Sequence, residues 1–494
     1  MLVERLKSRL GPHKVYSDEA ITLLYAREPS GLRGVAPYAV VFPESTEEVS
    51  FIVREAYRAE TPLYLHGSGS SLSGSAVPLE EGIVVSFERM SSIRELSVVD
   101  GFVEAEAGVR LGELNDVLAA KGYMFPVDPA SASVATVGGA VNTGAGGLRG
   151  AKYGTMRDWV LGVEAVLPDE HGTVLRLGCR LVKCRQGYDL TRLIVGSEGT
   201  LAAVTAAVLR ITPLPEHVVV AAAFYERLED LVEASVELRE RGLQPLMLEF
   251  MDEPSVRAAA VMVKASGGGL EARGHLLLVA LETCREAAAE RLESLASMLK
   301  TSGAHSVYTA ISMKEAEERG LLALRRAMYP SHVKLSWERK GVGALVYVED
   351  IAVPPSKLLD AVRGIRQLAS HYGFDLMLGG HIGDGNLHPI VAFNPRDRGE
   401  AERALSFFED VMRLAVKLGG TVSAEHGIGV LKREGLRMEL EEKGAAKALE
   451  LMAKIKSVFD PKNILNPHKI VAPSSAGRRE WGGGFGAWGV EGAH

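Results

Sequence analysis

Residues 63–74 read LYLHGSGSSLSG, in which a short apolar strand, Leu63–Leu65, runs directly into a loop of glycine and serine. Small residues in this position can turn successive backbone N–H groups and hydroxyls toward a phosphate oxygen. The loop is not a Walker sequence, because no lysine follows it, and Leu72 breaks the G-x-G-x-x-G pattern. A phosphate-binding loop and an ordinary surface loop both remain open on these residues alone.

Further segments of small residues follow between residues 128 and 201. They are Asp128–Ser131, Ala135–Gly139, Gly144–Gly147 and Val195–Leu201. Glycine supplies 53 of the 494 residues, about 11% against a usual ~7%, and clustered glycine indicates backbone that closely approaches a phosphate or a flat ring. Together the segments predict an elongated groove of the kind that a dinucleotide needs. Unrelated turns are the alternative.

Around these segments, alternating strand and helix patterns predict a first α+β region that ends near Pro213-Leu214-Pro215. Residues 39–42 are expected to form a strand, and Ser45-Thr46-Glu47-Glu48 a capping box that begins a helix. The other expected elements are a hairpin of residues 95–99 and 102–107 around Asp100-Gly101, a helix over 111–121, and paired strands over 160–167 and 173–177.

Beyond residue 215, longer amphipathic stretches predict a second α+β region with helices on one face of an antiparallel sheet. The expected helices are 227–241, 284–299, 314–328 and 356–371, and the expected strands are 218–224, 275–281 and 344–353. Residues 401–470 are expected to be mostly helical, and the glycine-rich tail to be flexible.

Composition excludes several classes of protein. The formal net charge is -7 and no dense lysine or arginine run occurs, which argues against a nucleic-acid partner. The three cysteines, Cys179, Cys184 and Cys284, form no C-x-x-C pair, so their spacing predicts neither a disulfide framework nor an iron–sulfur domain. Neither a signal peptide nor the ~18 apolar residues of a membrane-spanning helix is found. We therefore expect a cytoplasmic globular protein.

The most informative segment of the second half is residues 381–388, HIGDGNLH. If Asp384-Gly385 is a two-residue hairpin turn, His381 and His388 lie directly opposite each other. Cross-strand partners have Cβ atoms ~4.5–5.5 Å apart, which suits two imidazoles sharing one divalent metal ion. Asp384 is expected to cap backbone N–H groups in the turn rather than bind metal. Longer turns and two ordinary histidines are the alternatives.

Residues 423–429, SAEHGIG, offer a third metal ligand. Glu425 can supply a carboxylate oxygen, which leaves His426 as a base beside the metal. The alternative is that this pair only precedes a helix.

In this order, the motifs resemble the FAD-linked oxidase family with the vanillyl-alcohol-oxidase, or p-cresol methylhydroxylase (PCMH), type of flavin domain. The resemblance runs from about Tyr38 to Ile470 and is most specific at residues 381–388, at EHGIG (425–429) and at FDP…LNP (459–467). Within the family the chain is most similar to D-lactate dehydrogenase, the flavin subunit of glycolate oxidase and D-2-hydroxyglutarate dehydrogenase.

The resemblance implies an α+β fold: a two-subdomain PCMH-type FAD-binding domain, an α+β cap (substrate) domain with an antiparallel sheet, and a C-terminal helical segment that returns to the flavin. The expected boundaries are 1–34 for an N-terminal helical extension, 35–214 for the FAD-binding domain, 215–425 for the cap, 426–472 for the C-terminal segment and 473–494 for the flexible tail.

Site residues are carried over motif by motif. The positions that match the family's FAD contacts are His66, Gly67, Ser68, Gly69, Ser70, Ser71, Ser73, Gly74, Asp128, Pro129, Ser131, Thr136, Gly138, Gly139, Tyr153, Gly154, Thr155, Glu198, Gly199, Val204 and Asn466. The metal positions are His381, His388 and Glu425, the base is His426, and Arg325 looks like the clamp for the substrate carboxylate, with Asn386 also facing the substrate.

Departures from the family pattern refine these expectations. His66 stands where arginine is frequent, Gly144 where asparagine is usual and Ala202 where glycine is usual. Ser70 stands where relatives that bind FAD covalently have histidine, which implies non-covalent FAD. Val348 stands where the hydroxyglutarate enzymes have lysine, which favours a small monocarboxylate.

The resemblance implies a dehydrogenase that moves a hydride from C2 of a small D-2-hydroxy acid, D-lactate before glycolate, to FAD N5. The metal would hold the hydroxyl oxygen and His426 would take its proton. Zinc suits two imidazoles and a carboxylate, although manganese or iron would also fit. The alternatives are a D-2-hydroxyglutarate dehydrogenase, a non-redox enzyme like alkylglycerone-phosphate synthase, and a non-catalytic FAD-binding subunit.

The electron acceptor is expected to be a quinone, an electron-transfer flavoprotein or a partner subunit. A homodimer is the default oligomer, and peripheral association with the membrane stays open.

Overall fold

The computed structural model describes residues 2–185, 187–265 and 271–471 and divides the chain into two compact units. Unit 1 contains Met1–Gly147, Gly154–Leu214 and the chain from Glu425 onward, and unit 2 contains Leu148–Tyr153 and Pro215–Ala424. The tail that the sequence predicts to be flexible lies outside the described residues. None of the helices in the described ranges is long and apolar enough to cross a membrane.

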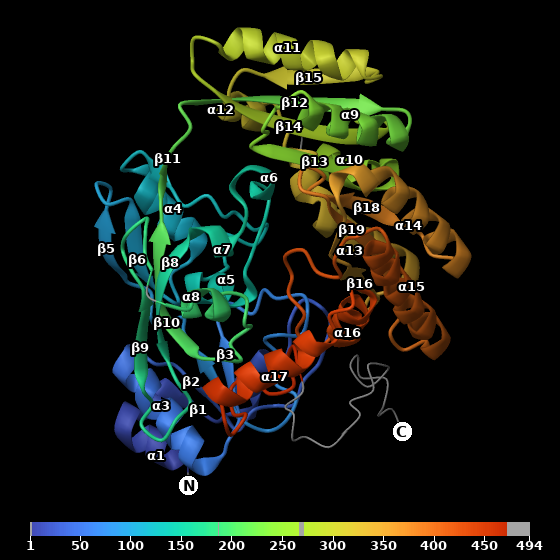
Figure 1. Ribbon diagram of the computed structural model, residues 1–494. Helices are drawn as coiled ribbons and strands as arrows, with labels where there is room; N and C mark the ends of the chain where they lie inside the picture. The colour runs from blue at the N-terminus through green and yellow to red at the C-terminus, as the bar shows by residue number, and fades with distance from the viewer. Residues whose placement is uncertain (1, 186, 266–270, 472–494) are drawn as a thin grey trace. The chain divides into compact units, whose positions relative to one another are not determined.

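The first sheet of unit 1 is formed by short, largely apolar strands, of which the three parallel ones are buried along their whole length (Figure 1). Its strand order is β1-β2-β4-β3, with β2, β4 and β3 parallel. The strands are β1 (Val15–Tyr16), β2 (Ala39–Val41), β3 (Leu63–His66) and β4 (Ile83–Ser86), beside the helices α1 (Leu2–Leu10), α2 (Glu19–Thr22) and α3 (Thr46–Ala59) and the 3-10 turns Pro12–Lys14 and Leu23–Ala26.

Helix α3 packs its apolar face on this sheet, with Val49, Ile52 and Val53 in the same core as the strands. Ser45 caps the helix by accepting from the N–H of Glu48. The expected capping box is only half formed, because the Glu48 carboxylate accepts from the N–H of Glu44 instead of that of Ser45.

The second sheet of unit 1 has the order β5-β6-β10-β8-β9 and is antiparallel throughout. The expected hairpin forms, but Ser97 pairs with Phe102, so its loop has the four residues 98–101 rather than the two predicted. The strands are β5 (Ile93–Ser97), β6 (Phe102–Glu106), β8 (Val160–Val166), β9 (Val174–Gly178) and β10 (Ala203–Arg210), joined by α4 (Leu111–Ala119), α5 (Val137–Thr143), α7 (Met156–Trp159) and α8 (Leu190–Ile194), with β7 (Tyr123–Met124) pairing β11 (Thr212–Pro213).

Two connections complete unit 1. A disulfide joins Cys179 to Cys184 after β9, a local bridge that the spacing analysis did not predict. The chain returns at its end through α16 (Arg433–Glu442) and α17 (Lys447–Phe459), and Ile464 and Asn466 then hydrogen-bond to both backbone groups of Leu63 (Figure 1). The last part of the fold therefore lies against the strand that leads into the glycine–serine loop.

Unit 2 is built on an eight-stranded sheet whose pairs are all antiparallel, as predicted. Its order is β15-β12-β14-β13-β18-β19-β16, with the short β17 also paired to β19. The strands are β12 (His217–Tyr225), β13 (Met247–Met251), β14 (His275–Thr283), β15 (Ser306–Ala310), β16 (Leu345–Val348), β17 (Ile351–Ala352), β18 (Met377–Gly380) and β19 (Asn386–Phe393).

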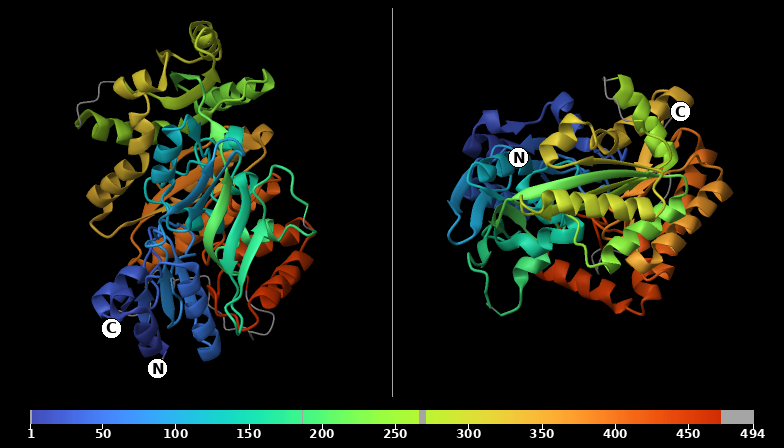
Figure 2. Two further views of the ribbon diagram at one scale, coloured as in Figure 1. Left: turned by 90° about the vertical axis from the view of Figure 1, so that its left-hand side faces the viewer. Right: turned by 90° about the horizontal axis from the view of Figure 1, so that it is seen from above.

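Helices cover both faces of this sheet, which corrects the expectation of one covered face (Figure 2). The physical sign was present in β12, whose eight residues from Val218 to Tyr225 are apolar and buried without alternation, as in a strand covered on both sides. The helices are α6 (Gly150–Tyr153), α9 (Leu228–Glu240), α10 (Glu253–Ala265), α11 (Ala288–Thr301), α12 (Met313–Glu318), α13 (Ala323–Lys340), α14 (Leu358–Tyr372) and α15 (Arg398–Lys417), with a 3-10 turn at Pro355–Lys357.

Two predicted elements of unit 2 are interrupted. The helix expected over 314–328 divides into α12 and α13 at Gly320, whose positive φ of 71° ends the first helix. The strand expected over 344–353 divides into β16 and β17, and the residues between them are Glu349 and Asp350.

Candidate active site

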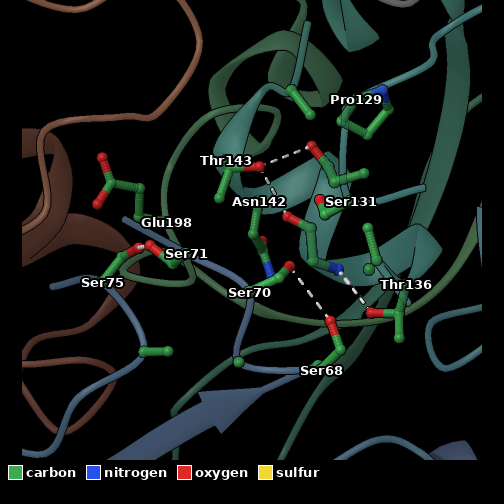
Figure 3. A pocket seen from close by; sticks show the side chains of 18 of the residues that line it. Ser68, Ser70, Ser71, Ser75, Pro129, Ser131, Thr136, Asn142, Thr143 and Glu198 are labelled. Atoms are coloured by element: carbon green, nitrogen blue, oxygen red, sulfur yellow. Dashed lines mark hydrogen bonds between the residues drawn. The ribbon is translucent and has the colours of Figure 1, made fainter. Parts of the chain in front are cut away.

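A cavity in unit 1 collects most of the small residues that the sequence singled out. Its volume is about 1190 Å³, including the part open to solvent. Figure 3 shows the hydroxyls of Ser68, Ser70, Ser71 and Ser75 together with Asn142 and Thr143 of α5. The predicted residues that line it are His66, Gly67, Ser68, Gly69, Ser70, Ser71, Pro129, Ser131, Thr136, Gly138, Gly139, Glu198, Val204 and Asn466.

The glycines let two walls of this cavity approach each other. A Cβ at Gly67 would lie 2.5 Å from Oγ1 of Thr136, and a Cβ at Gly138 would lie 2.6 Å from Cβ of Ala107. Thr136 also caps α5 by accepting from the N–H of Gly139 at 3.2 Å. The loop after β3 thus packs closely against the start of α5 at Gly67, and α5 packs closely against the residue after β6 at Gly138, so a larger residue at either glycine would disturb one of these contacts.

The cavity has the donors and acceptors that a dinucleotide needs, and FAD fits that description. Serine hydroxyls line one part, and in the described residues the buried Oδ1 of Asn142 has no protein hydrogen-bond partner. Burial lowers the pKa of His66 to about 4, so this lining imidazole is neutral near pH 7. An unsatisfied buried amide oxygen is costly unless a ligand or water serves it.

Other predicted FAD contacts lie elsewhere. Ser73 and Gly74 are held from behind, since the carbonyl of Ser73 accepts from Val430 and that of Gly74 from Lys469. Thr155 caps α7. Asp128, Gly154 and Gly199 belong to unit 1 but do not line the cavity, and Tyr153, which belongs to unit 2, donates its hydroxyl to Glu282.

Sequence reasoning missed several lining residues, above all Asn142 and Thr143. Both stand in the run VGGAVNTGAGG, where two amide and hydroxyl side chains interrupt apolar and small residues. This polar pair is the feature that could have indicated a lining position, but the prediction relied on the neighbouring glycines instead. Phe87 and Ala107 have no comparable signal in the sequence, because apolar residues next to a strand predict burial in the core rather than a place in a binding site.

Glu198 joins the cavity to the EHGIG segment. Its carboxylate is buried and accepts from the N–H groups of Ile428 at 2.6 Å and Gly429 at 2.7 Å. A Cβ at Gly427 would lie 2.7 Å from Oε1 of Glu198, so glycine is needed there. Burial raises the pKa of Glu198 to about 7, although both backbone donors oppose that rise.

Glu425 and His426 line the same cavity as the glycine–serine loop. Nε2 of His426 lies 3.8 Å from Oε1 of Glu425, and both side chains keep some exposure. Gly146 lies against Glu425, since a Cβ there would be 3.1 Å from Oε2. Unit 1 therefore presents a carboxylate and an imidazole at the wall of its cavity.

In unit 2, the HIGDGNLH segment is a hairpin with a longer turn than predicted. His388 on β19 pairs with Gly379 of β18, and residues 381–385 form the turn, so His381 does not face His388 directly. The two histidines are instead diagonal neighbours on one face, because residues two apart on a strand share a face. Their ring centroids are 5.4 Å apart. Asp384 accepts from the N–H of Asn386 at 3.3 Å, which confirms its predicted capping role.

Both imidazoles are anchored through Nδ1. Nδ1 of His381 lies 2.7 Å from Oε1 of Glu249, and Nδ1 of His388 lies 3.1 Å from the carbonyl oxygen of Glu349. Carboxylate and carbonyl oxygens only accept, so Nδ1 carries the proton in each contact. With the proton on Nδ1, the neutral form of each ring has its lone pair on Nε2, the atom that can bind a divalent metal ion.

Arg325 is positioned by the same carboxylate as His381. Its Nε donates to Oε2 of Glu249 at 2.8 Å, and within the described chain no hydrogen bond to either of its terminal nitrogens is found. Sequence reasoning missed Glu249, although a charged residue inside the apolar strand MLEFM was a signal for a buried partner. Burial raises the pKa of Glu249, but His381 and Arg325 outweigh it and hold the pKa below its usual range.

Asn386 and Asp350 bind each other beside the histidines. The amide nitrogen of Asn386 donates to Oδ1 of Asp350 at 2.8 Å and to the carbonyl of Ile351 at 2.9 Å. Asp350 also accepts from Ser423 and from the N–H of Ala424. This buried carboxylate ties β16 and β17 to the residues that directly precede Glu425 in the chain.

The predicted chemical groups are thus divided between the units. Unit 1 holds the cavity with Glu425 and His426, while unit 2 holds His381, His388 and Arg325. Two imidazoles on one face of a sheet, each held through Nδ1, are metal-ligand chemistry. An arginine held at Nε keeps a terminal pair that suits a carboxylate.

Comparisons with known proteins show the family to which the chain belongs. Residues 214–470 match the family profile described as FAD linked oxidases, C-terminal domain, and residues 37–178 match that of the FAD binding domain. The chain is 33% identical over 483 residues to the glycolate oxidase subunit GlcD of Bacillus subtilis (strain 168), covering 97% of this chain and 99% of that protein. It is 39% identical over 444 residues to a D-lactate dehydrogenase of Archaeoglobus fulgidus, covering 89% and 92%.

Two solved structures are also similar. The 4-ethylphenol oxidase from Gulosibacter chungangensis, in its isoeugenol complex, matches with a TM-score of 0.77 at 18% identity, over 96% of this chain and 97% of that one. p-Cresol methylhydroxylase with substrate bound matches with a TM-score of 0.76 at 17% identity, over 97% of each chain. These matches confirm the predicted PCMH-type flavin fold.

Proposed function

The chain belongs to the FAD-linked oxidase family and is an FAD-linked oxidoreductase of the D-lactate dehydrogenase and glycolate oxidase type, and from this premise we propose that it oxidises a small D-2-hydroxy acid to the 2-oxo acid. D-lactate is the proposed substrate and glycolate the second choice. The observation that carries the proposal is the pair His381 and His388, each anchored through Nδ1 so that Nε2 is the ligand atom.

The cavity of unit 1 is the proposed FAD site, and FAD supplies an acceptor for two electrons and one proton equivalent as hydride when bound. Loop residues 67–71 would donate N–H and hydroxyl groups to the pyrophosphate, and Asn142 would serve the ring or ribose. Ser70 cannot form the histidyl bond of covalent relatives, so the cofactor is proposed to be non-covalent.

His381, His388 and Glu425 are the proposed metal ligands. Two imidazole nitrogens and a carboxylate oxygen match the His₂Glu donor set of catalytic zinc, and the ion would supply a Lewis acid that steadies negative charge on the hydroxyl oxygen. Zinc is proposed, and the same donors also accept manganese or iron.

His426 is the proposed base. It lines the cavity, and an imidazole has an ordinary pKa of ~6.5, which suits acceptance of the hydroxyl proton near neutral pH. Arg325 would bind the substrate carboxylate through its terminal nitrogens and so fix the position of C2. Asn386 would act beside it from β19.

Substrate size is proposed from Val348, an apolar residue opposite Ile390 on β19. A second carboxylate, as in D-2-hydroxyglutarate, would find no cation at this position, and the cost of desolvating it would go uncompensated. The complete set of histidines and Glu425 argues against a non-redox synthase and against a non-catalytic subunit.

The chain has three cysteines, too few for the four that hold an iron–sulfur cluster, so it offers no such cluster to take electrons from the flavin. The electrons must therefore leave to a separate acceptor. A quinone, an electron-transfer flavoprotein or a partner subunit in the cytoplasm or at the membrane surface is proposed, with a homodimer as the default assembly.

Anaerobic mixing tests the substrate. The holoenzyme is mixed separately with D-lactate, L-lactate, glycolate and D-2-hydroxyglutarate while flavin absorbance near its visible maximum is followed. We expect rapid bleaching with D-lactate, slower bleaching with glycolate and little with the other two. Bleaching fastest with D-2-hydroxyglutarate would overturn the assignment to a small monocarboxylate.

The variant His426→Asn tests the base. Asparagine keeps a polar side chain of similar reach but accepts no proton near neutral pH, so the rate of flavin bleaching by D-lactate should fall at least ~100-fold. FAD content, measured from the absorbance ratio of the purified variant, should be unchanged. A near-normal bleaching rate would remove His426 as the base.

A further inference from the structure

Glu249 stands at the centre of β13 with only 1% of its side chain exposed, and each of its carboxylate oxygens accepts from a different residue. Oε1 lies 2.7 Å from Nδ1 of His381, and Oε2 lies 2.8 Å from Nε of Arg325. One buried carboxylate therefore touches both a proposed metal ligand and the proposed clamp for the substrate.

The sheet explains why these residues meet. Phe250 of β13 pairs with Gly380 of β18, so the same register places Glu249 opposite His381, just past the end of β18. On its other side β18 pairs with β19, which presents His388 on the shared face. Glu249 in β13, His388 in β19 and His381 in the first position after β18 are therefore brought together on one face of the sheet.

Arg325 reaches the same carboxylate from α13, whose Leu324 and Met328 pack in the same core as the strands of this sheet. A Cβ at Gly379 would overlap the end of Met328 and would lie 2.8 Å from its sulfur. Met328 follows Arg325 by three residues and so shares its side of the helix. Gly379 therefore leaves room for the end of Met328 on the side of α13 from which Arg325 meets Glu249.

We propose that Glu249 is a positioning residue that couples the metal site to the substrate-carboxylate site, an inference that rests on the proposed function. Through Oε1 it holds the proton of His381 on Nδ1 and turns Nε2 outward. Through Oε2 it fixes the guanidinium of Arg325 at Nε and leaves the terminal nitrogens in a fixed plane. The two sites then keep a constant separation, which a bound 2-hydroxy acid would have to span.

The variant Glu249→Gln separates this role from plain structural support. A glutamine has one acceptor oxygen and a donor NH₂, so it cannot accept from His381 and Arg325 together. We expect Zn²⁺ affinity, measured on the purified FAD-containing protein by competition with a chromogenic chelator, to fall 10–100-fold. We also expect KM for D-lactate to rise at least 10-fold, with FAD content unchanged.

Asp252→Asn is the matched control. Asp252 is buried three residues further along and caps α10 by accepting from the N–H of Ser255 at 3.0 Å, without contacting Arg325 or His381. Because asparagine caps a helix as well as aspartate does, we expect the variant to fold normally and to keep Zn²⁺ affinity and KM at wild-type values. If Glu249→Gln behaves like Asp252→Asn, Glu249 is only structural and the proposal is wrong.

Double variants test the coupling itself. In an Arg325→Ala background, adding Glu249→Gln should leave KM unchanged but still weaken Zn²⁺ binding, while in a His381→Ala background it should not weaken Zn²⁺ binding further. Independent, fully additive effects in both backgrounds would overturn the proposal. If no hydroxy acid bleaches the wild-type flavin, the proposed function fails, and the Zn²⁺ measurements still decide whether Glu249 positions His381.

Discussion

Single buried charges fix the parts of this protein that carry chemistry. Glu198 holds the backbone after His426, Lys469 holds Gly74 and Val77 behind the glycine–serine loop, and Glu249 holds His381 and Arg325. Burial lowers the pKa of Lys469 to about 7, and it raises the pKa of Glu198 to about the same value. Each such residue is costly to bury and is retained with specific partners, as expected where geometry must be exact.

Glu198 makes stability depend on pH in a defined window. Its folded pKa of about 7 exceeds its usual 4.5, so between these values the folded carboxyl keeps a proton that the unfolded chain has released. The free energy of unfolding therefore falls as pH rises through this window. We expect wild type to lose about 3 kcal/mol relative to Glu198→Gln between pH 4.5 and 7.

Denaturant unfolding of the FAD-containing protein at pH 5, 6 and 7 checks this expectation. The control is Glu113→Gln on α4, an exposed glutamate for which the difference from wild type should stay flat. A constant difference between wild type and Glu198→Gln across these three values would contradict the assignment.

The functional role of a residue could be predicted from the sequence only where a motif marks that residue. His381, His388, Glu425 and His426 stand in short, unusual patterns, and Asp384 caps its turn as predicted. No motif marks the roles of three other residues. Glu249 and Glu198 act through partners that are more than 100 residues away in the chain, and Asn142 has a role only as part of a cavity wall.

At the scale of elements, strand and helix positions follow from local patterns, while register and coverage do not. The hairpins around residues 98–101 and 381–385 form where predicted, yet both turns are longer than two residues. Turn length depends on what packs against the hairpin: a Cβ at Gly385 would overlap the carbonyl of Val353, and the turn carbonyl of Gly383 accepts from Arg239 of α9. No local pattern carries that information.

Gly379→Ala tests the approach of α13 to the sheet. An added Cβ would overlap the end of Met328 and would lie 2.9 Å from the carbonyl oxygen of Phe250, so we expect the free energy of unfolding to fall by about 1–3 kcal/mol. KM for D-lactate should rise several-fold, because α13 carries Arg325. Denaturant unfolding and steady-state kinetics measure the two effects.

A size-compensating partner makes this test specific. Combining Gly379→Ala with Met328→Ala should cost less than the sum of the two single variants, because the shorter side chain makes room for the new Cβ. Gly399→Ala, where a Cβ would meet nothing closer than 3.5 Å, should change the free energy of unfolding by less than ~0.5 kcal/mol. Additive losses in the double variant would show that the two positions do not press on each other.

At the scale of the whole molecule, the order of motifs was more informative than any one of them. The loose glycine segments, HIGDGNLH and EHGIG indicate the family only when they are taken together in their order along the chain. The family profiles match residues 37–178 and 214–470, in the same order. The chain's return after Glu425 to unit 1 also fits the predicted C-terminal segment, although the domain boundaries as drawn from the sequence stay predictions. The continuous apolar residues of β12 already indicate that both faces of the sheet in unit 2 are covered, although one covered face was predicted.

The central claim is that substrate oxidation needs a metal ion held by His381, His388 and Glu425 in addition to FAD. The direct measurement is anaerobic flavin bleaching by D-lactate before and after a chelator removes metal from the FAD-containing enzyme, with metal content determined by elemental analysis. We expect the stripped enzyme to keep its FAD, to bleach with dithionite but at least ~100-fold more slowly with D-lactate, and to recover when Zn²⁺, Mn²⁺ or Fe²⁺ is added. If the flavin still bleaches at the original rate when the metal content has fallen about tenfold, to below one-tenth of an ion per chain, the account is contradicted.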